Sequence, residues 1–257
     1  MTYGSYLNLR QLLSLQETRS DGPEHDEMLF IIIHQVYELW FKQVLHELDQ
    51  LNRHIVADAL ARGDRQLLRI LKILKTLVAQ LDVLETMTPL EFQSFRSFLG
   101  SASGFQSGQF REIEFVLGFK DAAHLDRFRD LAPYSRLERR YREPSLWAHF
   151  VALLAKKGYP IPEEVLNKPA REPVAPSEEV QDVLITVYRE NHELAGFCEL
   201  LLDMDEGIQE WRYRHVMMVR RTIGTRGGTG GSEGASYLQS TLFRPVFPDL
   251  WEIRTRL

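Results

Sequence analysis

Residues 25–51, HDEMLFIIIHQVYELWFKQVLHELDQL, decide the fold of this chain. Apolar residues recur there every three or four positions, and no proline occurs between Pro23 and Pro89, so the pattern predicts two long helices with a break near residues 61–64. At about 100° per residue, one narrow face of the first helix carries Phe30, His34, Tyr37, Phe41 and Leu48. Much of the remaining circumference is covered by Ile32, Val36, Leu39 and Trp40. A helix that is apolar nearly all round must be buried on most sides, so we expect it inside a large bundle or against another subunit.

The rest of the chain continues this helical pattern. Further amphipathic stretches cover residues 89–99, 108–117, 144–157, 177–204 and 205–222. Alternating strand patterns of useful length are missing from the sequence. We therefore predict an all-α fold, a large helical bundle formed by residues 1–257 as one domain.

Composition narrows the class of protein. Hydrophobic residues make up 44% and charged residues 26% of the 257, which is typical of a globular chain, and a net charge of −5 with scattered basic residues argues against nucleic-acid binding. Cys198 is the single cysteine, which excludes an intrachain disulfide and cysteine-based metal clusters. The N-terminus lacks a secretory pattern, and the longest apolar run, residues 28–33, is far shorter than the ~20 residues that cross a bilayer. We expect a cytoplasmic protein without a membrane span.

Two segments interrupt the helices. Residues 160–176 contain five prolines and predict a stiff extended connection, which we interpret as a surface excursion rather than a linker between domains. Residues 224–234, GTRGGTGGSEG, contain six glycines, of which Gly224 suits a helix C-cap. This stretch lacks the Gly-Lys-Ser/Thr ending of a P-loop and follows a helix, so it is either a flexible surface turn or a lid that orders over a ligand with Thr229 supplying a hydroxyl.

Two histidines stand on apolar helix faces. The His34 imidazole points into an aromatic interior, where it is either a hydrogen-bonded core residue or a functional group. His215 shares its face with Ile208, Trp211, Val219 and Thr222. A neutral imidazole in such a cleft suits an axial haem ligand, with Arg212, Arg214, Arg220 or Arg221 near the propionates, although a packed histidine on a cationic helix is the more frequent case.

Arg96 is the third candidate, because Phe92, Phe95, Phe98 and Leu99 surround it on a short helix. A partly buried guanidinium requires an anion, which is either a protein carboxylate or the carboxylate of a substrate. Other catalytic arrangements are poorly supported. The Glu-x-x-His pair of di-iron bundles is missing, and we expect the remaining histidines, His25, His46, His54, His124, His149 and His192, on the surface.

Four ordered segments closely resemble the tryptophan 2,3-dioxygenase family. They are SYLNLRQLLSLQ (5–16), the opening stretch 25–51, FRSFLGSASGFQSGQFREIE (95–114) and YRHVMMVRRTIGTRGGTGGSEGASYL (213–238). The resemblance implies an all-helical homotetramer with haem b that inserts both atoms of O₂ across the indole C2–C3 bond of L-tryptophan. The product is N-formylkynurenine, in the first step of the kynurenine pathway.

The resemblance also implies roles for single residues. His215 matches the proximal ligand of the haem iron, His34 the distal histidine that hydrogen-bonds the indole N–H, and Arg96 the arginine that binds the substrate carboxylate. Thr229 matches a lid hydroxyl on the substrate, whereas Ser103 and Trp211 are expected beside the haem. Phe30 and Phe92 match pocket walls. The N-terminal arm, residues 1–20, carries three residues that would complete a neighbouring subunit's site, Tyr3, Tyr6 and Leu7.

Three other functions are compatible with the same sequence features. A relative of the family could carry out monooxygenation of an aromatic substrate, a haem sensor would bind haem without turnover, and a plain helical scaffold would bind no haem.

Overall fold

The computed structural model describes residues 1–22, 24–227 and 235–257. Every regular element in these ranges is an α-helix or a short 3-10 helix, which confirms the predicted all-α fold. Within the same ranges, no helix is both long and apolar enough to cross a membrane.

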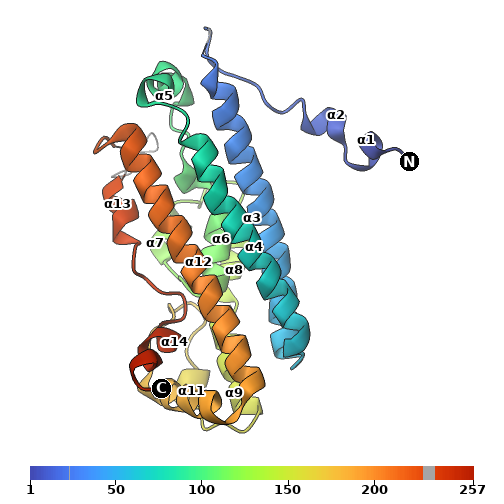
Figure 1. The fold of residues 1–257 in the computed structure, drawn as a ribbon, viewed down its shortest axis with the longest axis vertical. Coiled ribbons are helices and arrows are strands. Elements are labelled where there is room, and N and C mark those ends of the chain that lie inside the picture. Colours follow the sequence, from blue (N-terminus) through green and yellow to red (C-terminus); the bar gives the residue numbers. More distant parts are fainter. Residues whose placement is uncertain (23, 228–234) are drawn as a thin grey trace.

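Three long helices form the frame of the molecule. Helices α3 (Asp26–Val56) and α4 (Leu60–Leu84) run antiparallel as a hairpin, and α12 (His192–Ile223) packs along α4 (Figure 1). Their contact faces are dry, since Leu48, Leu51 and Ile55 of α3 and Leu67 of α4 expose none of their surface. Burying each such side chain contributes about 1.5–3 kcal/mol, so this seam is a major source of stability.

The break between α3 and α4 lies at residues 57–59, not at 61–64 as the sequence predicted. Asp58 makes the turn in the left-handed region at φ 54°, which a short polar residue tolerates. Gly63, within the predicted break, lies inside α4. A Cβ there would lie 3.1 Å from Leu51 Cδ1 and 3.3 Å from Phe197 Cε2, so this glycine serves close helix packing rather than a turn.

The predicted boundary between residues 204 and 205 is also wrong. Helix α11 (Glu178–Glu190) ends at Asn191, whose side chain caps α12 by accepting a hydrogen bond from Leu194 N. Asp205 lies within α12 and is fully buried. Its carboxylate accepts from Val246 N at 2.8 Å, Phe247 N at 3.0 Å and Trp251 Nε1 at 2.9 Å, which fastens the C-terminal segment to the frame.

Shorter helices close one end of the frame and position the site. Thr88 and Glu91 form a capping box that starts α5 (Pro89–Arg96), and Ser107 caps α6 (Gly108–Leu117). The 3-10 turns η1 (Ser97–Leu99) and η2 (Gly104–Gln106) connect them. The pattern 89–99 therefore splits into α5 and η1, while 108–117 is confirmed as a single helix. At the C-terminal end of α12, Gly224 is the C-cap with φ 65°, as predicted.

The remaining helices are shorter and lie outside the three-helix frame. They are α9 (Leu146–Lys156), which was predicted as 144–157, and seven that the sequence patterns did not reveal: α1 (Tyr3–Tyr6), α2 (Leu9–Leu12), α7 (Ala122–Asp126), α8 (Tyr134–Arg142), α10 (Glu163–Leu166), α13 (Ala235–Ser240) and α14 (Pro248–Glu252). A final 3-10 turn, η3, spans Ile253–Thr255. Most of these are too short or too polar to show a periodic face; α8, for example, buries only Leu137. The proline-rich segment contains α10, so it is less extended than predicted.

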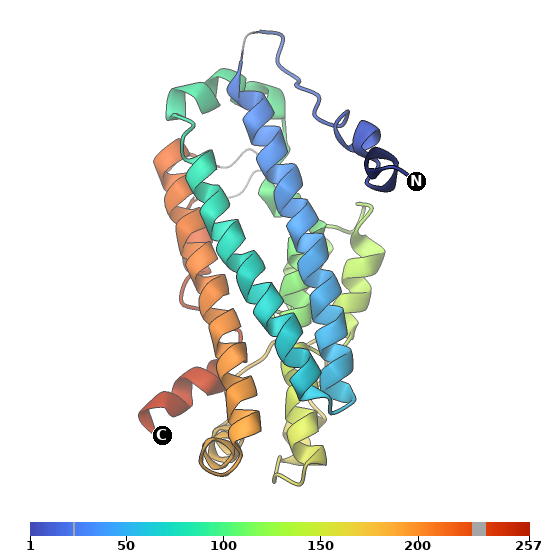
Figure 2. The ribbon, with the colours of Figure 1, turned by 45° about the vertical axis from the view of Figure 1, so that its right-hand side comes forward.

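The N-terminal arm leaves the body of the molecule, and Figure 2 shows α1 and α2 beside it rather than within it. Its base is attached to α3, because Gln16 Nε2 bonds Gln35 Oε1 at 2.6 Å and the buried Glu27 carboxylate accepts from Arg19 N at 2.7 Å and Ser20 N at 3.0 Å. Burial raises the pKa of Glu27, but these hydrogen bonds, with that of the Ser20 hydroxyl, outweigh it and keep the pKa below its usual value. The tip is unattached, with Tyr3 76% and Tyr6 70% exposed.

Candidate active site

A cavity of about 300 Å³ lies between α3, α4, α5, α6, α12 and α13, and the turn from Leu99 to Ser107 forms part of its wall. The lining is mainly apolar and aromatic, with a small number of polar groups from each element. Such a cavity is the usual form of a site for a small molecule or cofactor.

Aromatic side chains build one wall of the cavity from α3 and α5. The ring centroids of Phe30 and Phe92 are 5.8 Å apart, and Phe95 lies 5.5 Å from each of them. These separations fall in the range of favourable aromatic pairs. Phe30 and Phe92, both predicted as pocket walls, therefore do line one cavity.

His34 borders this wall, and its hydrogen bond fixes its tautomer. Nδ1 lies 2.7 Å from the carbonyl oxygen of Phe30, which can only accept, so Nδ1 carries the hydrogen and Nε2 has a free lone pair. The apolar surroundings disfavour the protonated ring and lower the pKa of His34, despite the Phe30 carbonyl and the nearby Glu38 carboxylate. His34 thus offers a neutral acceptor to the cavity.

His215 reaches the same cavity from α12. Its ring stacks on Trp211 with centroids 5.3 Å apart and planes 8° from parallel, and no described residue hydrogen-bonds to it. Burial, with a smaller effect of His34, lowers the pKa of His215 to about 4. The imidazole is therefore neutral at physiological pH, with a nitrogen available to a ligand.

Trp211 is held in turn by an aromatic box. Its ring lies 5.0 Å from Phe110, 6.2 Å from Phe41 and 6.3 Å from Tyr37. The hydroxyl of Tyr37 donates to the Leu77 carbonyl at 2.5 Å, which fixes that ring against α4. The box orients Trp211, and Trp211 orients the His215 ring.

Arg96 lies at the α5 end of the cavity and is half-buried. It donates from Nη2 to the Gly227 carbonyl at 2.7 Å, and no carboxylate of the described residues forms an ion pair with it. Of the two anions that the sequence left open, the described chain does not supply the protein one. Ser103 also lines the cavity, where its hydroxyl accepts from Phe105 N at 3.3 Å, whereas Thr229 lies outside the described residues.

The arginines expected near the propionates are mostly elsewhere. Arg214 pairs with Asp82 at 2.7 Å and Arg221 with Glu85 at 3.5 Å, at the C-terminal end of α4, and Arg220 is exposed. Only Arg212 of this set reaches the cavity. The prediction failed for the other three because a cationic helix face more often meets acidic residues of a neighbouring helix than a ligand.

The surface assignment of the other histidines was correct for His25, His46 and His192 and wrong for three. His54, His124 and His149 are half-buried, and each contacts a polar side chain: Gln50, Tyr237 and Asn52, respectively. Burial has the largest effect on the pKa of His124 and of His149, and it lowers both.

Several polar residues of the cavity were not singled out from the sequence. Arg111 and Glu114 of α6 and Tyr237 of α13 all line it, and both α6 residues are buried. The available signal was the segment REIEFVLG, residues 111–118, where charged side chains interrupt an otherwise apolar helix. By contrast, the expected substrate residues Tyr3, Tyr6 and Leu7 do not line this chain's own cavity.

Known proteins similar to this chain belong to one family. The family model described as tryptophan 2,3-dioxygenase matches residues 1–134 and 163–257. The chain belongs to the tryptophan 2,3-dioxygenase family. It is 58% identical to the tryptophan 2,3-dioxygenase of Herpetosiphon aurantiacus, over 100% of this chain and 98% of that protein. Identity is 52% to the enzyme of Anaeromyxobacter sp. strain K and 42% to that of Bacillus anthracis, again over the whole chain and over 96% and 93% of those proteins.

Proposed function

We propose that this chain is a haem-dependent dioxygenase that converts L-tryptophan and O₂ to N-formylkynurenine, an oxidoreductase of tryptophan catabolism. One observation carries the proposal: His34 and His215 face the same cavity from α3 and α12, each neutral and each with a nitrogen free of described hydrogen-bond partners. Membership of the family supplies the reaction.

The donor set of the cavity fits haem b. No group of three His, Cys, Asp or Glu side chains comes together in the described parts of the chain, so a metal there must bring most of its ligands with it. A single neutral imidazole in an apolar cavity is what haem iron requires from the protein. His215 would hold the haem iron, with Trp211 against its ring, and Ser103 would be among the polar groups near the haem.

When bound, haem supplies the activation of O₂ and the redox chemistry. The chain's own residues bind and orient the substrate. His34 Nε2 would accept the indole N–H, the Arg96 guanidinium would bind the carboxylate, and Phe30 and Phe92 would enclose the ring. Thr229 would add a lid hydroxyl.

Two fixed polar points on a rigid planar substrate define its position. An acceptor on the ring and a cation on the carboxylate leave the indole little freedom to rotate, and this converts a random encounter into an oriented one. The aromatic wall excludes water from the reacting edge. Specificity for tryptophan follows from the distance between His34 and Arg96.

The deciding experiment is anaerobic reconstitution of the purified chain with haem, followed by L-tryptophan and ¹⁸O₂. The proposal expects a product that carries both labelled atoms. A product with a single labelled atom would indicate monooxygenation, a haem spectrum without oxygen consumption would indicate a sensor, and failure to take up haem would indicate a scaffold. Each of these three results contradicts the proposal.

We also propose a homotetramer in which the arm of one subunit completes the site of a neighbour. The exposed aromatic tip of the arm and the apolar residues Met28, Ile32 and Leu39, 39–51% exposed on α3, support this arrangement. A second copy would cover both.

Complementation tests the exchange of arms. A chain lacking residues 2–8 and a chain carrying Arg96→Leu should each be nearly inactive. Co-expressed, they should recover activity, because an intact arm of one chain can close the intact pocket of the other. Mixed oligomers that stay as inactive as their parents would refute the exchange, and a monomeric mass in solution would refute the tetramer.

The remaining assignments follow the same reasoning. We propose that the 257 residues act as one catalytic domain in the cytoplasm, in agreement with a single, buried cysteine. Fractionation of cells that express the chain, followed by activity assay, tests the location.

A further inference from the structure

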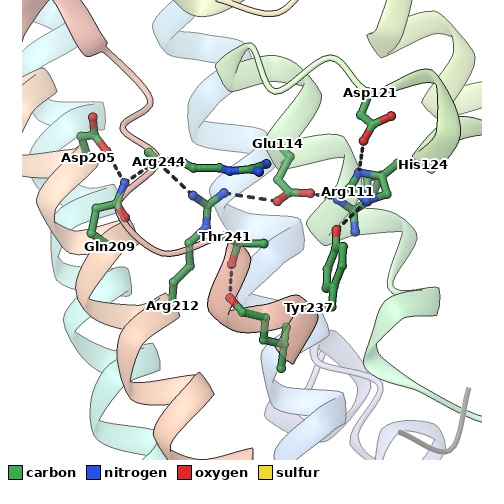
Figure 3. Close-up of polar contacts among 11 residues, drawn as sticks. Arg111, Glu114, Asp121, His124, Asp205, Gln209, Arg212, Tyr237, Thr241 and Arg244 are labelled. Carbon is green, nitrogen blue, oxygen red and sulfur yellow. Dashed lines mark hydrogen bonds and ion pairs between the residues drawn. The ribbon is translucent and has the colours of Figure 1, made fainter. Parts of the chain in front are cut away.

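Arg111, Glu114, Arg212 and Tyr237 line the cavity, and His124 contacts two of them from outside its lining; we call these five residues the α6–α13 cluster (Figure 3). It combines residues from α6, α7, α12 and α13, and it is separate from the elements that carry Arg96 and His34. The proposed function gives no role to these residues.

Two buried guanidinium groups share one carboxylate in this cluster. The side chains of Arg111 and Arg212 are 8% and 7% exposed, and both donate to Glu114, Arg212 Nη2 at 3.3 Å. Arg111 Nε is buried and has no hydrogen-bond partner among the described residues. A buried cation without full compensation is costly, so the cluster has the charge and the donors for one more anion.

The nearest other carboxylates do not fill this role. Asp205 attracts Arg212 but forms no ion pair with it, since its oxygens accept from Val246 N, Phe247 N, Trp251 Nε1 and Gln209 Nε2. Asp121 lies 3.5 Å from His124 Nδ1, and half of its side chain is exposed to solvent. Neither therefore compensates the second guanidinium directly.

Hydrogen-bond roles inside the cluster leave a further donor unused. Arg111 Nη1 lies 3.0 Å from His124 Nδ1, and because a guanidinium can only donate, Nδ1 must accept. The neutral His124 ring then carries its hydrogen on Nε2, which donates to the Tyr237 hydroxyl at 2.6 Å. The hydroxyl oxygen is thus an acceptor from His124, and its own hydrogen has no acceptor in the described part of the chain.

We propose that the α6–α13 cluster is an anion site of the cavity, and that it receives one carboxylate of the haem through Tyr237 and Arg111. The inference rests on the proposed function. Haem b would bring two propionates into the cavity, and the substrate would bring a third carboxylate. Arg96 is assigned to the substrate carboxylate, so the propionates need other partners. The cluster offers an O–H donor, an unused N–H donor and excess positive charge to one of them. Hydrogen bonds of this kind to a carboxylate are stronger than neutral ones.

Binding of haem to the purified apo-protein tests the site without turnover. The variant is Tyr237→Phe, which keeps the ring against Phe105, 4.7 Å away, and the matched control is Tyr213→Phe, an exposed tyrosine of α12. Each protein is titrated with haem and with haem dimethyl ester, which lacks the negative charges, and binding is followed by the Soret band and by tryptophan fluorescence.

Tyr237→Phe should weaken haem binding about tenfold or more and dimethyl ester binding several times less. Tyr213→Phe should match the wild type with both ligands. An equal loss with haem and ester, or no loss with haem, would overturn the anion site while leaving the proposed function intact. Failure of the wild type to bind haem would overturn both, and a thermal melt of each variant checks that the fold is unchanged.

Discussion

The neutral state of His215 makes the stability of the haem-free protein depend on pH in a calculable way. Its pKa is about 4 in the folded chain, against 6.5 for an unperturbed histidine. Between these two values the unfolded chain holds a proton that the folded imidazole does not, so the free energy of unfolding falls as the pH is lowered through this window. At pH 5 the difference amounts to about 2 kcal/mol from this side chain alone, relative to pH 7.

Urea unfolding at pH 7 and pH 5 measures this effect. His215→Gln removes the titrating group, so the variant should lose about 2 kcal/mol less than the wild type between the two pH values. Comparing differences cancels the contributions of the other histidines. His46→Gln, at an exposed position of α3, is the control and should keep the wild-type difference. If His215→Gln showed the same pH dependence as the wild type, the buried, neutral state of this imidazole would be disproved.

Three other predictions address the substrate contacts and the frame. Arg96→Leu should lower kcat/KM for tryptophan by about 10- to 100-fold without changing haem content, because the carboxylate loses a charged partner worth about 1.5–3 kcal/mol; an unchanged kcat/KM would exclude the contact. The wild type should prefer tryptophan over its N1-methyl derivative, whereas His34→Ala should discriminate less; a preference that survives the substitution would show that His34 does not read the indole N–H. Asp205→Ala should reduce the free energy of unfolding by about 3 kcal/mol or more, since two buried backbone N–H groups and the Trp251 indole N–H lose their acceptor, with the exposed Asp203→Ala as control; equal urea midpoints would contradict this.

Local signals in the sequence were sufficient to predict a helix end where a few neighbouring residues determine it. The helix 108–117 forms as predicted, with Ser107 as its N-cap, and Gly224 is the predicted C-cap of α12. The two wrong boundaries fall at Gly63 and Asp205, whose roles depend on residues far away in the chain. One lets α4 approach Leu51 and Phe197, and the other holds the C-terminal segment.

The candidate site divides in the same way. His34, His215 and Arg96 stood out because polar groups on apolar faces are unusual, and the fold does bring all three to one cavity. Arg111 and Tyr237 did not stand out, since they are 126 positions apart and only the packed structure reveals that both contact His124. Proximity between distant, ordinary-looking residues has no signature in a single sequence.

The cavity combines residues of α3 and α12, which are far apart in the chain, so its walls are synthesised at different times. His34 leaves the ribosome about 180 residues before His215, which corresponds to roughly 10 to 40 s of translation. Until α12 emerges, the α3–α4 hairpin presents His34 and part of the aromatic wall but lacks His215, the imidazole that we propose to hold the iron. A chain that ends before α12 should therefore not hold the cofactor through His215, and haem loading would report that α12 has been synthesised.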